Sequence, residues 1–332
     1  MAWISELKAD PTEWLMEPSN PSVRYWTLLD VLGREPDDPD VAEARRSIMA
    51  SEPVKAILGT QEPGGHWCDP GDMYLPKYRA TTHQLLILAE LGATRTPAIE
   101  RAVEHVYKFQ RLSGHFLTEL PKTEQGRASV VKDGCCFDGN VLQYLIHFGY
   151  LDDPRTLKLL SFIQSYHDAE NAGWRCRAYP INRDAVFPVN CYMGAMKVLK
   201  ALSTMPERSR TPEIKALIGR EVENVLENGV YRYLRNPDGS RKDKAGWKRF
   251  GFPLFYQSDA LEVLDTLTRL GVGDERMAGA VELVKAAQQG DGPWLLSNTF
   301  NGKMWADIEE KGRPSKWVTL RAVRALRRFH GG

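Results

Sequence analysis

Apolar positions recur along the chain with a spacing that predicts helices almost throughout. Four stretches share one pattern, in which an apolar helix runs into a glutamine, a glycine turn and an aromatic residue: 52–67 (EPVKAILGTQEPGGHW), 103–116, 159–176 and 281–294. A degenerate copy lies at 222–233. The aromatic residues follow one another at intervals of roughly 50 to 60 positions, which is typical of a repeat architecture.

A second kind of helix follows these stretches after a long connection. It is predicted at 81–92 (TTHQLLILAELG), 138–149, 190–202, 258–271 and 315–329, and an unpaired copy opens the chain at 20–33. The unit is therefore a helix pair that occurs about five and a half times. Strand signals are scarce, so the fold class is all-α.

The two kinds of helix differ in polarity. The second kind is apolar on nearly every side, as in LLILAEL (85–91), and suits an inner ring, whereas the first is amphipathic and suits an outer layer. This predicts a single α/α-toroid domain over residues 1–332, with about six helix pairs in two rings. All the long connections should emerge at one end of the ring, which we expect to be the working face.

The Gln–Gly–Trp/Phe endings and the inner-helix pattern resemble the repeats of the squalene-cyclase and prenyltransferase superfamily over about residues 20–330. The resemblance implies an α/α toroid. It also implies that each glutamine ties the end of an outer helix to the neighbouring turn, with the aromatic residue stacked nearby. The repeated phrase is then part of the scaffold, and the fold alone does not fix the reaction.

The chain departs from the catalytic motifs of that superfamily. It lacks the Asp-x-Asp-Asp motif with which class II terpene cyclases protonate their substrate. PDDPD (36–40) has another spacing, and Asp40 is expected to cap a helix. Protein prenyltransferases hold zinc with Asp, Cys and His. Cys136 and Asp138 begin an inner helix here, but no later inner helix offers a His near its start.

Composition narrows the class of function. The chain is 42% hydrophobic and 26% charged, with a formal net charge of +1, which is ordinary for a globular protein and argues against a nucleic-acid partner. No apolar run is long enough to span a membrane, and the N-terminus does not read as a signal peptide. Five cysteines do not indicate a disulfide framework, so we expect a cytoplasmic protein. The oligomeric state is open, a homo-oligomer included.

Two carboxylates are the first catalytic candidates. Asp138 could be a general acid or base at the start of an inner helix, or it could cap a helix that begins near Gly139. Asp259 lies at the equivalent place across the ring, where it could share acid and base roles with Asp138, and the alternative is that Ser258 or Asp259 is an N-cap.

Other candidates lie at the same end of the ring. His83 and Tyr256 could assist acid–base chemistry, and Cys191 could be a nucleophile if the helix N-terminus stabilises its thiolate. His83 could equally be a core residue, and the cysteines could be core fillers. The residues predicted to bind substrate are Asn140, Lys77, Tyr78, Gln257, Trp67, Trp305 and Trp317.

Cofactors are not indicated, and we predict no metal site. The spacings Cys-x-x-Cys and His-x-x-x-His do not occur, although a toroid can assemble ligands from separate repeats. In that case the ligands would come from Cys136, Asp138, Cys191 and His83. Of the five cysteines (Cys68, Cys135, Cys136, Cys176 and Cys191), none falls on a predicted outer helix.

These observations favour an enzyme that acts by acid–base chemistry on a hydrophobic or cyclic small molecule in a central pocket. The resemblance makes a terpenoid-like substrate the first choice. A carbohydrate-active hydrolase or lyase, a zinc-dependent transferase or hydrolase, and a non-catalytic small-molecule or peptide binding protein remain alternatives.

Overall fold

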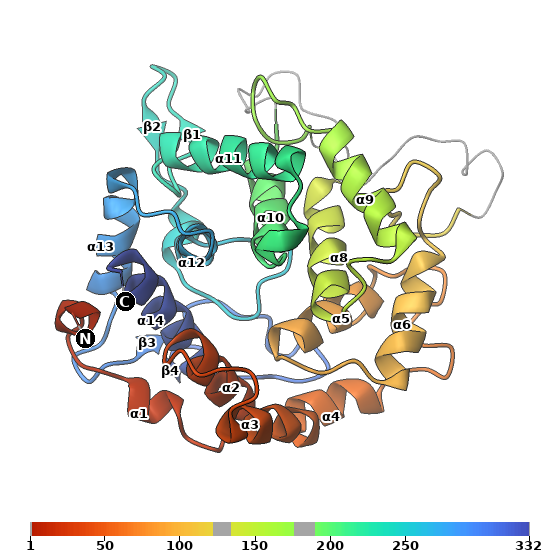
Figure 1. The fold of residues 1–332 in the computed structure, drawn as a ribbon, viewed down its shortest axis with the longest axis horizontal. Coiled ribbons are helices and arrows are strands. Elements are labelled where there is room, and N and C mark those ends of the chain that lie inside the picture. The colour runs from red at the N-terminus through yellow and green to blue at the C-terminus, as the bar shows by residue number, and fades with distance from the viewer. Residues whose placement is uncertain (1, 122–133, 176–189, 332) are drawn as a thin grey trace.

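The computed structural model describes residues 2–121, 134–175 and 190–331. Its helices form two concentric rings, and the N- and C-terminal ends of the chain lie near each other (Figure 1). The inner ring consists of α2 (Pro21–Asp30), α5 (Thr81–Glu90), α8 (Cys135–His147), α10 (Tyr192–Ser203), α12 (Ala260–Arg269) and α14 (Lys316–Phe329). The predicted all-α toroid is confirmed.

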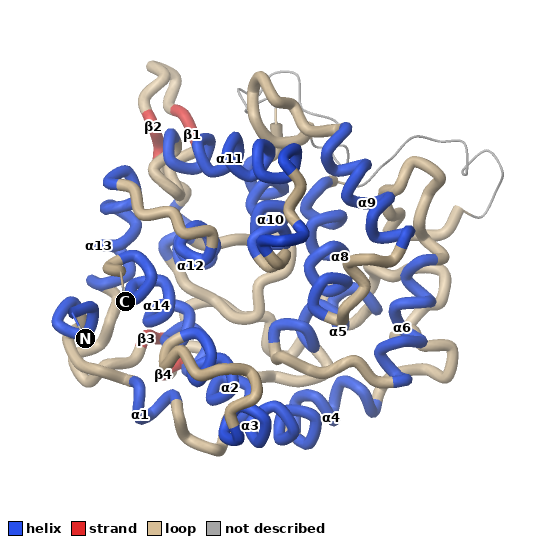
Figure 2. Tube along the Cα trace, in the orientation of Figure 1, coloured by secondary structure: helices blue, strands red, loops and turns tan. Residues whose placement is uncertain are grey.

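The outer ring is made of amphipathic helices. These are α3 (Pro39–Ala50), α4 (Glu52–Gly59), α6 (Pro97–Tyr107), α9 (Pro154–Ser165), α11 (Pro212–Glu227) and α13 (Ala278–Ala286). The four-residue α1 (Thr12–Leu15) and the 3-10 helices η1 (Ala2–Glu6), η2 (Glu207–Ser209), η3 (Ala245–Lys248) and η4 (Glu275–Met277) complete the helical elements of the described residues. Helices dominate the trace in Figure 2.

Strands are few and short in the described part of the chain. Antiparallel pairs join β1 (Leu234–Arg235) to β2 (Arg241–Lys242) and β3 (Trp294–Leu295) to β4 (Pro314–Ser315). The second pair lies in the last long connection, directly before α14.

The inner helices pack side by side around the ring axis. α8 contacts α5 and α10, α10 contacts α12, and α14 contacts both α12 and α2. The indole Nε1 of Trp26 on α2 donates a hydrogen bond of 3.1 Å to the carbonyl of Glu90 on α5, which links the remaining neighbours. In α5 every residue from Thr81 to Ala89 is buried, as expected for a helix that is apolar on nearly every side.

Five helices begin with a proline behind a polar cap. Because proline fixes φ and lacks the N–H that a first turn leaves unpaired, it suits the first helical position. The side chains of Asn20, Asp38, Thr96, Asp153 and Thr211 accept a backbone N–H from the first turn of α2, α3, α6, α9 and α11. The cap of α3 is thus Asp38, two positions before the predicted Asp40, so that prediction was wrong. The backbone N–H of Asp40 is the one that the Asp38 side chain accepts.

The glutamines tie each outer helix to the next part of the outer ring. The Nε2 amide of Gln61 donates to Gly65 O at 3.0 Å and to Ala98 O, in the first turn of α6, at 2.9 Å. Gln110 makes the same pair of bonds to Gly114 O and Arg155 O on α9. The expected scaffold role of these glutamines is confirmed.

The aromatic residues of the same phrase are held by hydrogen bonds of the indole N–H, of the backbone N–H, or of both. The indole N–H groups of Trp67, Trp174 and Trp294 donate to carbonyl oxygens near the end of the preceding outer helix, at 2.7 to 2.9 Å. The backbone N–H groups of Trp67, Phe116 and Trp294 donate instead to a side chain on the first turns of an inner helix, namely Thr81, Asp138 and Thr319. The phrases of Trp67 and Trp294, which make both bonds, therefore connect an outer helix to an inner one.

Candidate functional site

The sequence-predicted residues gather at the end of the ring where the inner helices begin. The rings of Tyr78 and His83 lie 5.7 Å apart, and Phe255 lies 5.0 Å from His83. The Lys77 ammonium lies 5.3 Å from the ring centroid of Tyr256. We call this group, with Tyr74 and Phe300, the aromatic cluster. It combines residues from α5 and from the connections that precede α5, α12 and α14.

His83 is the most strongly perturbed group of the aromatic cluster. Its side chain is buried, and burial together with the nearby Lys77 lowers its pKa to about 3. The imidazole is therefore neutral near pH 7. Its Nδ1 atom has no hydrogen-bond partner among the described residues. A buried polar atom without a partner is costly, which makes His83 a candidate for contact with a ligand.

Asn140 and Gln257 adjoin the aromatic cluster. The Asn140 Nδ2 amide donates to Phe255 O at 3.2 Å. Burial raises the pKa of the Tyr78 hydroxyl above its usual value, although a hydrogen bond with Gln257 opposes the increase. The Oδ1 atom of Asn140 has no partner within the described ranges. The structure thus brings together Lys77, Tyr78, His83, Asn140, Tyr256 and Gln257.

Both candidate carboxylates bind backbone amides. Asp138 is buried, and its carboxylate accepts the Phe116 N–H at 3.1 Å. The helix of Asp138 begins at Cys135 rather than near Gly139, so Asp138 lies in the first turn and is not the N-cap residue. Asp259 does cap α12, accepting the N–H groups of Glu262 at 2.7 Å and Gly251 at 2.9 Å.

Asp259 has an unusual protonation equilibrium. Burial raises its pKa to about 6, although Arg321 and the two backbone hydrogen bonds oppose the increase. A carboxyl group in this range populates both protonation states near neutrality, as acid–base catalysis requires. Asp259 is therefore the stronger of the two carboxylate candidates.

Cys135 and Cys191 lie close to one another at the start of two inner helices. Cys191 caps α10, and its Sγ accepts the Gly194 N–H at 3.4 Å. A Cβ atom on Gly194 would fall 2.3 Å from the Cys135 Sγ and 3.5 Å from the Cys191 Sγ, so both thiols approach this glycine. Cys176 lies outside the described residues. Within the described residues, no group of three or more His, Cys, Asp and Glu side chains is arranged to hold a metal ion.

The three predicted tryptophans occupy different places. Trp67 is fully buried in the scaffold contacts described above. The Trp305 indole donates to Arg79 O at 3.0 Å and lines a peripheral pocket of about 550 Å³ between the starts of α2 and α4. Trp317, on the first turn of α14, stacks on Phe252 at 4.2 Å and lines both that pocket and a central cavity.

The central cavity was not predicted at its observed position. It has a volume of about 520 Å³ and is bounded by inner helices and by the short turns that follow them. Trp26, Trp317 and Leu320 form apolar wall, and exposed residues such as Asp152 and Arg208 lie at the rim. The cavity thus lies toward the helix C-termini, whereas the sequence placed the candidates at the N-termini.

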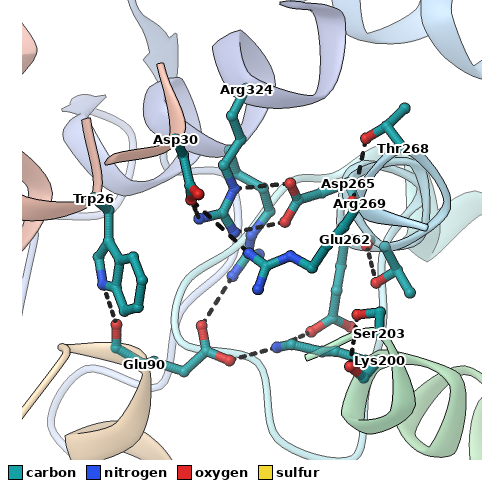
Figure 3. Close-up of polar contacts among 12 residues, drawn as sticks. Trp26, Asp30, Glu90, Lys200, Ser203, Glu262, Asp265, Thr268, Arg269 and Arg324 are labelled. Atoms are coloured by element: carbon teal, nitrogen blue, oxygen red, sulfur yellow. Dashed lines mark hydrogen bonds and ion pairs between the residues drawn. The ribbon is translucent and has the colours of Figure 1, made fainter. Parts of the chain in front are cut away.

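A network of ion pairs links residues of the cavity lining to residues directly behind it (Figure 3). Glu90 on α5 accepts from the Lys200 ammonium at 2.5 Å, and Glu262 on α12 accepts from the same ammonium at 2.8 Å. Glu262 also pairs with the fully buried Lys197 at 2.7 Å. Burial alone would raise the pKa of each carboxyl. Lys200 and Arg321 nevertheless hold the pKa of Glu90 well below its usual range. Lys197, Lys200 and Arg321 lower that of Glu262 to about 2.

A second group of ion pairs joins α2, α12 and α14. The Arg324 guanidinium binds both oxygens of Asp265, at 2.7 and 2.5 Å, and reaches Asp30 on α2 at 3.1 Å. Figure 3 shows Arg324 between these two carboxylates. Burial opposes ionisation of Asp265, but Arg324 and Arg328 hold its pKa well below its usual range. Asp265 and Arg324 are therefore both charged, and they neutralise each other.

The charged residues in and beside the cavity follow a pattern in the sequence that could have predicted them. Charged pairs three positions apart interrupt otherwise apolar inner helices: Lys197 and Lys200, Glu262 and Asp265, and Arg321 and Arg324. A spacing of three places both members of a pair on one face of a helix. Such pairs on helices that are buried on all sides indicate a polar ring interior.

Comparison with known proteins finds likenesses at low sequence identity. No protein-family model and no curated protein matches the chain. Among solved structures, a substrate complex of the type II terpene cyclase MstE from Scytonema is 13% identical, with a TM-score of 0.47, and covers 94% of this chain and 87% of that chain. A protein from Actinoplanes is 14% identical, with a TM-score of 0.46, covering 95% and 90%.

Cellobiose 2-epimerase from Bacillus thermoamylovorans is 12% identical, with a TM-score of 0.44, and covers 76% of this chain and 74% of that chain. These likenesses assign no role to any residue of this chain. In the described residues no helix has the length and apolar character needed to cross a membrane.

Proposed function

We propose that the protein is an enzyme that transforms a hydrophobic or cyclic small molecule by acid–base chemistry inside the ring of inner helices. The observation that supports this most directly is the central cavity of about 520 Å³. Cavities of roughly 300 to 1,000 Å³ with apolar walls and a few polar groups are typical of small-molecule sites.

The cavity offers both kinds of contact that such a substrate needs. Trp26, Trp317 and Leu320 supply flat or apolar surface for a ring or a hydrocarbon. Two buried polar atoms in its lining, Trp317 Nε1 and Gln143 Oε1, have no hydrogen-bond partner among the described residues. Substrate polar groups would satisfy them and fix its orientation.

Asp259 is our first candidate for proton transfer, because its pKa of about 6 lies closest to neutrality among the carboxyls discussed above. Its carboxylate binds the Gly251 N–H, and Arg321, which lines the cavity, reaches Gly251 O at 3.4 Å. Asp259 is thus linked to a cavity residue through the backbone of Gly251.

The residues of the aromatic cluster extend the proposed site toward the helix N-termini. Asp138, His83, Tyr256 and Cys191 remain further catalytic candidates, and Asn140, Lys77, Tyr78, Gln257 and Trp305 remain proposed substrate contacts. The neutral His83 suits hydrogen bonding to a substrate rather than electrostatic binding.

The test is a substrate screen of the full-length protein with its Asp259→Asn variant. Terpenoids and mono- and oligosaccharides are incubated with the protein, and products are detected by chromatography with mass spectrometry, which also separates isomers of equal mass. For any substrate found, we expect D259N to lower kcat by about 100-fold or more while KM changes little. The exposed Asp238→Asn is the matched control and should leave kcat unchanged.

Each alternative gives a different result. A kcat that is equal in D259N and the wild type would exclude Asp259 as the acid–base group. A sugar product would establish the carbohydrate-active alternative. Ligands that bind but are never converted would identify a binding protein rather than an enzyme.

A further inference from the structure

The lining of the central cavity carries more positive than negative side chains. Five cations line it, namely Lys200, Arg208, Arg269, Arg321 and Arg324, against three carboxylates, namely Glu90, Asp152 and Asp265. The difference of five and three leaves an excess of two positive charges. Directly behind the lining, Lys197 and Arg328 balance Asp30 and Glu262, and Asp259, whose carboxyl interacts with Arg321, adds part of one negative charge.

We propose that this cavity holds an oxyanion-binding site centred on Arg321, so that its ligand bears a carboxylate or phosphate group. The inference rests on the proposed function, because it assumes that the substrate occupies this cavity, and it adds the charge of that substrate.

The cations of the cavity are not equally neutralised. Lys200 bonds to two carboxylates at 2.5 and 2.8 Å, and Arg324 binds Asp265 through two nitrogens. Arg321 differs: its Nη2 lies 3.6 Å from Glu90, and its Nη1 lies 3.4 Å from Gly251 O. Because a guanidinium has five N–H donors, Arg321 retains donors for a further acceptor.

Burial makes these spare donors significant. The Arg321 side chain is only 5% exposed, so water cannot compensate its charge as it does at the surface. An oxyanion in the cavity would supply that compensation and could accept two parallel hydrogen bonds from the planar guanidinium. Phe252 lies 5.8 Å from the guanidinium and stacks on Trp317, so an apolar wall adjoins the charge.

The negative ends of the helix dipoles do not account for Arg321. Arg321 lies in the second turn of α14, away from the negative end of its own helix, and Glu90, which lies 3.6 Å away, is the last residue of α5. The carbonyl groups at the ends of α5 and α2 have other partners: Trp26 Nε1 donates to Glu90 O, and Arg327 donates to Asp30 O. Arg269, held 3.9 Å from Asp30, is the second cation with spare donors.

The test measures binding of three probes of similar shape to the full-length protein by isothermal titration calorimetry at low ionic strength. Benzoate and phenyl phosphate carry an oxyanion, whereas benzamide is neutral. We expect the better of the two anions to bind at least about tenfold more tightly than benzamide. A preference for benzoate would indicate a carboxylate ligand, and a preference for phenyl phosphate a phosphate ligand.

Two variants locate the preference. Arg321→Gln should reduce the ratio of anion to benzamide affinity to near one, while Arg313→Gln, whose side chain is mostly exposed, should leave it unchanged. Should R321Q not fold, as judged by circular dichroism, Arg269→Gln takes its place, with a smaller but measurable loss expected.

The inference is overturned if the wild type binds benzoate, phenyl phosphate and benzamide equally. It is also overturned if the ratio of anion to benzamide affinity in R321Q or, should R321Q not fold, in R269Q equals that of the wild type. Equal binding of all three would leave the proposed function intact, because the cavity would still accept a small cyclic molecule. Failure of all three probes to bind at about 10 mM would count against both proposals.

Discussion

Gln288 and Ala9 join the two ends of the chain: the Gln288 Nε2 amide donates a hydrogen bond of 2.8 Å to the Ala9 carbonyl, across 279 positions. The same amide donates to Gly292 O at 2.8 Å. In Gln61 and Gln110 the equivalent contact reaches the first turn of the next outer helix. At Gln288 no further outer helix follows, and the segment before α1 takes its place. Gln288 therefore closes the outer ring together with Lys8, whose ammonium donates to Ala286 O and Gln288 O.

Replacement of Gln288 by Ala should therefore destabilise the whole fold. Two carbonyl oxygens would lose their donor and the Lys8 N–H its acceptor, and each buried group left without a partner costs about 1 to 3 kcal/mol. We expect the free energy of unfolding, measured by urea denaturation, to fall by about 2 kcal/mol or more. The neighbouring Gln289→Ala is the control, because its Nε2 reaches only Ala287 O, two residues away. Equal losses in the two variants would show that Gln288 does not close the ring.

Gly114 and Gly149 test how closely the glycine turns approach neighbouring helices. Both have positive φ, +106° and +79°. A Cβ atom on Gly114 would lie 2.3 Å from the Lys158 carbonyl oxygen on α9, whereas on Gly149 it would meet no atom within 4 Å. Gly149→Ala should cost only the conformational strain of about 1 to 2 kcal/mol.

Gly114→Ala adds a clash with backbone to the same strain, so its total cost should reach about 3 kcal/mol or more. Urea denaturation of both variants at one pH gives the comparison. A cost for G114A no larger than that for G149A would mean that α9 shifts away freely, contrary to a tightly tied outer ring.

The sequence predicted the helix pairs and the scaffold role of the glutamines, because both depend on local periodicity and on a repeated phrase. It was less accurate where local signals conflict. The start of α8 was predicted near Gly139, but the helix begins at Cys135, because Gly134 occupies the cap position and its lack of a side chain leaves no cap signal. At PDDPD the choice between neighbouring aspartates depends on backbone geometry, which composition does not reveal.

The candidate site was harder to predict for a different reason. Glu90, Lys200 and Glu262 lie on three inner helices and are far apart in sequence, and a single charge on an apolar helix does not show which partner it meets. The aromatic cluster was predicted better, because its members Lys77, Tyr78 and His83 are close in sequence. Only the closed ring places the charged side chains around one cavity.

The buried pair of Lys197 and Glu262 should respond asymmetrically to substitution. Glu262 neutralises both Lys197 and Lys200, whereas Lys200 also has Glu90. Glu262→Gln leaves Lys197 buried without its adjacent counter-charge and should cost about 3 to 5 kcal/mol of unfolding free energy.

Lys197→Met keeps the volume of the side chain and leaves Glu262 paired with Lys200. Because burial already lowers the pKa of Lys197, its charged form is unfavourable, and K197M should change the stability at pH 7 by no more than about 1 kcal/mol. Thermal and urea unfolding of both variants provide the measurement. A loss in K197M as large as in E262Q would contradict this account.

Asp259 should give the protein a stability that decreases as pH rises through the mildly acidic range. Burial raises its pKa from 3.8 to about 6, so the folded state holds this proton more tightly than the unfolded state does. The resulting stabilisation is fully present below pH 3.8 and is lost as pH rises through 6. A shift of about two pKa units corresponds to roughly 3 kcal/mol.

Asp259→Asn removes this titration while retaining a side chain that can cap α12. Unfolding free energies are measured by urea denaturation at intervals from pH 4 to pH 8. We expect the stability of the wild type relative to D259N to fall by about 2 to 3 kcal/mol between pH 4 and pH 7. Asp238→Asn removes an exposed carboxylate whose pKa is lowered by Ser240 and keeps Asp259. The stability of the wild type relative to D238N should therefore show no such fall. Parallel curves for the wild type and D259N would show that the Asp259 carboxyl titrates in its ordinary range, and would remove the basis for its role as the acid–base group.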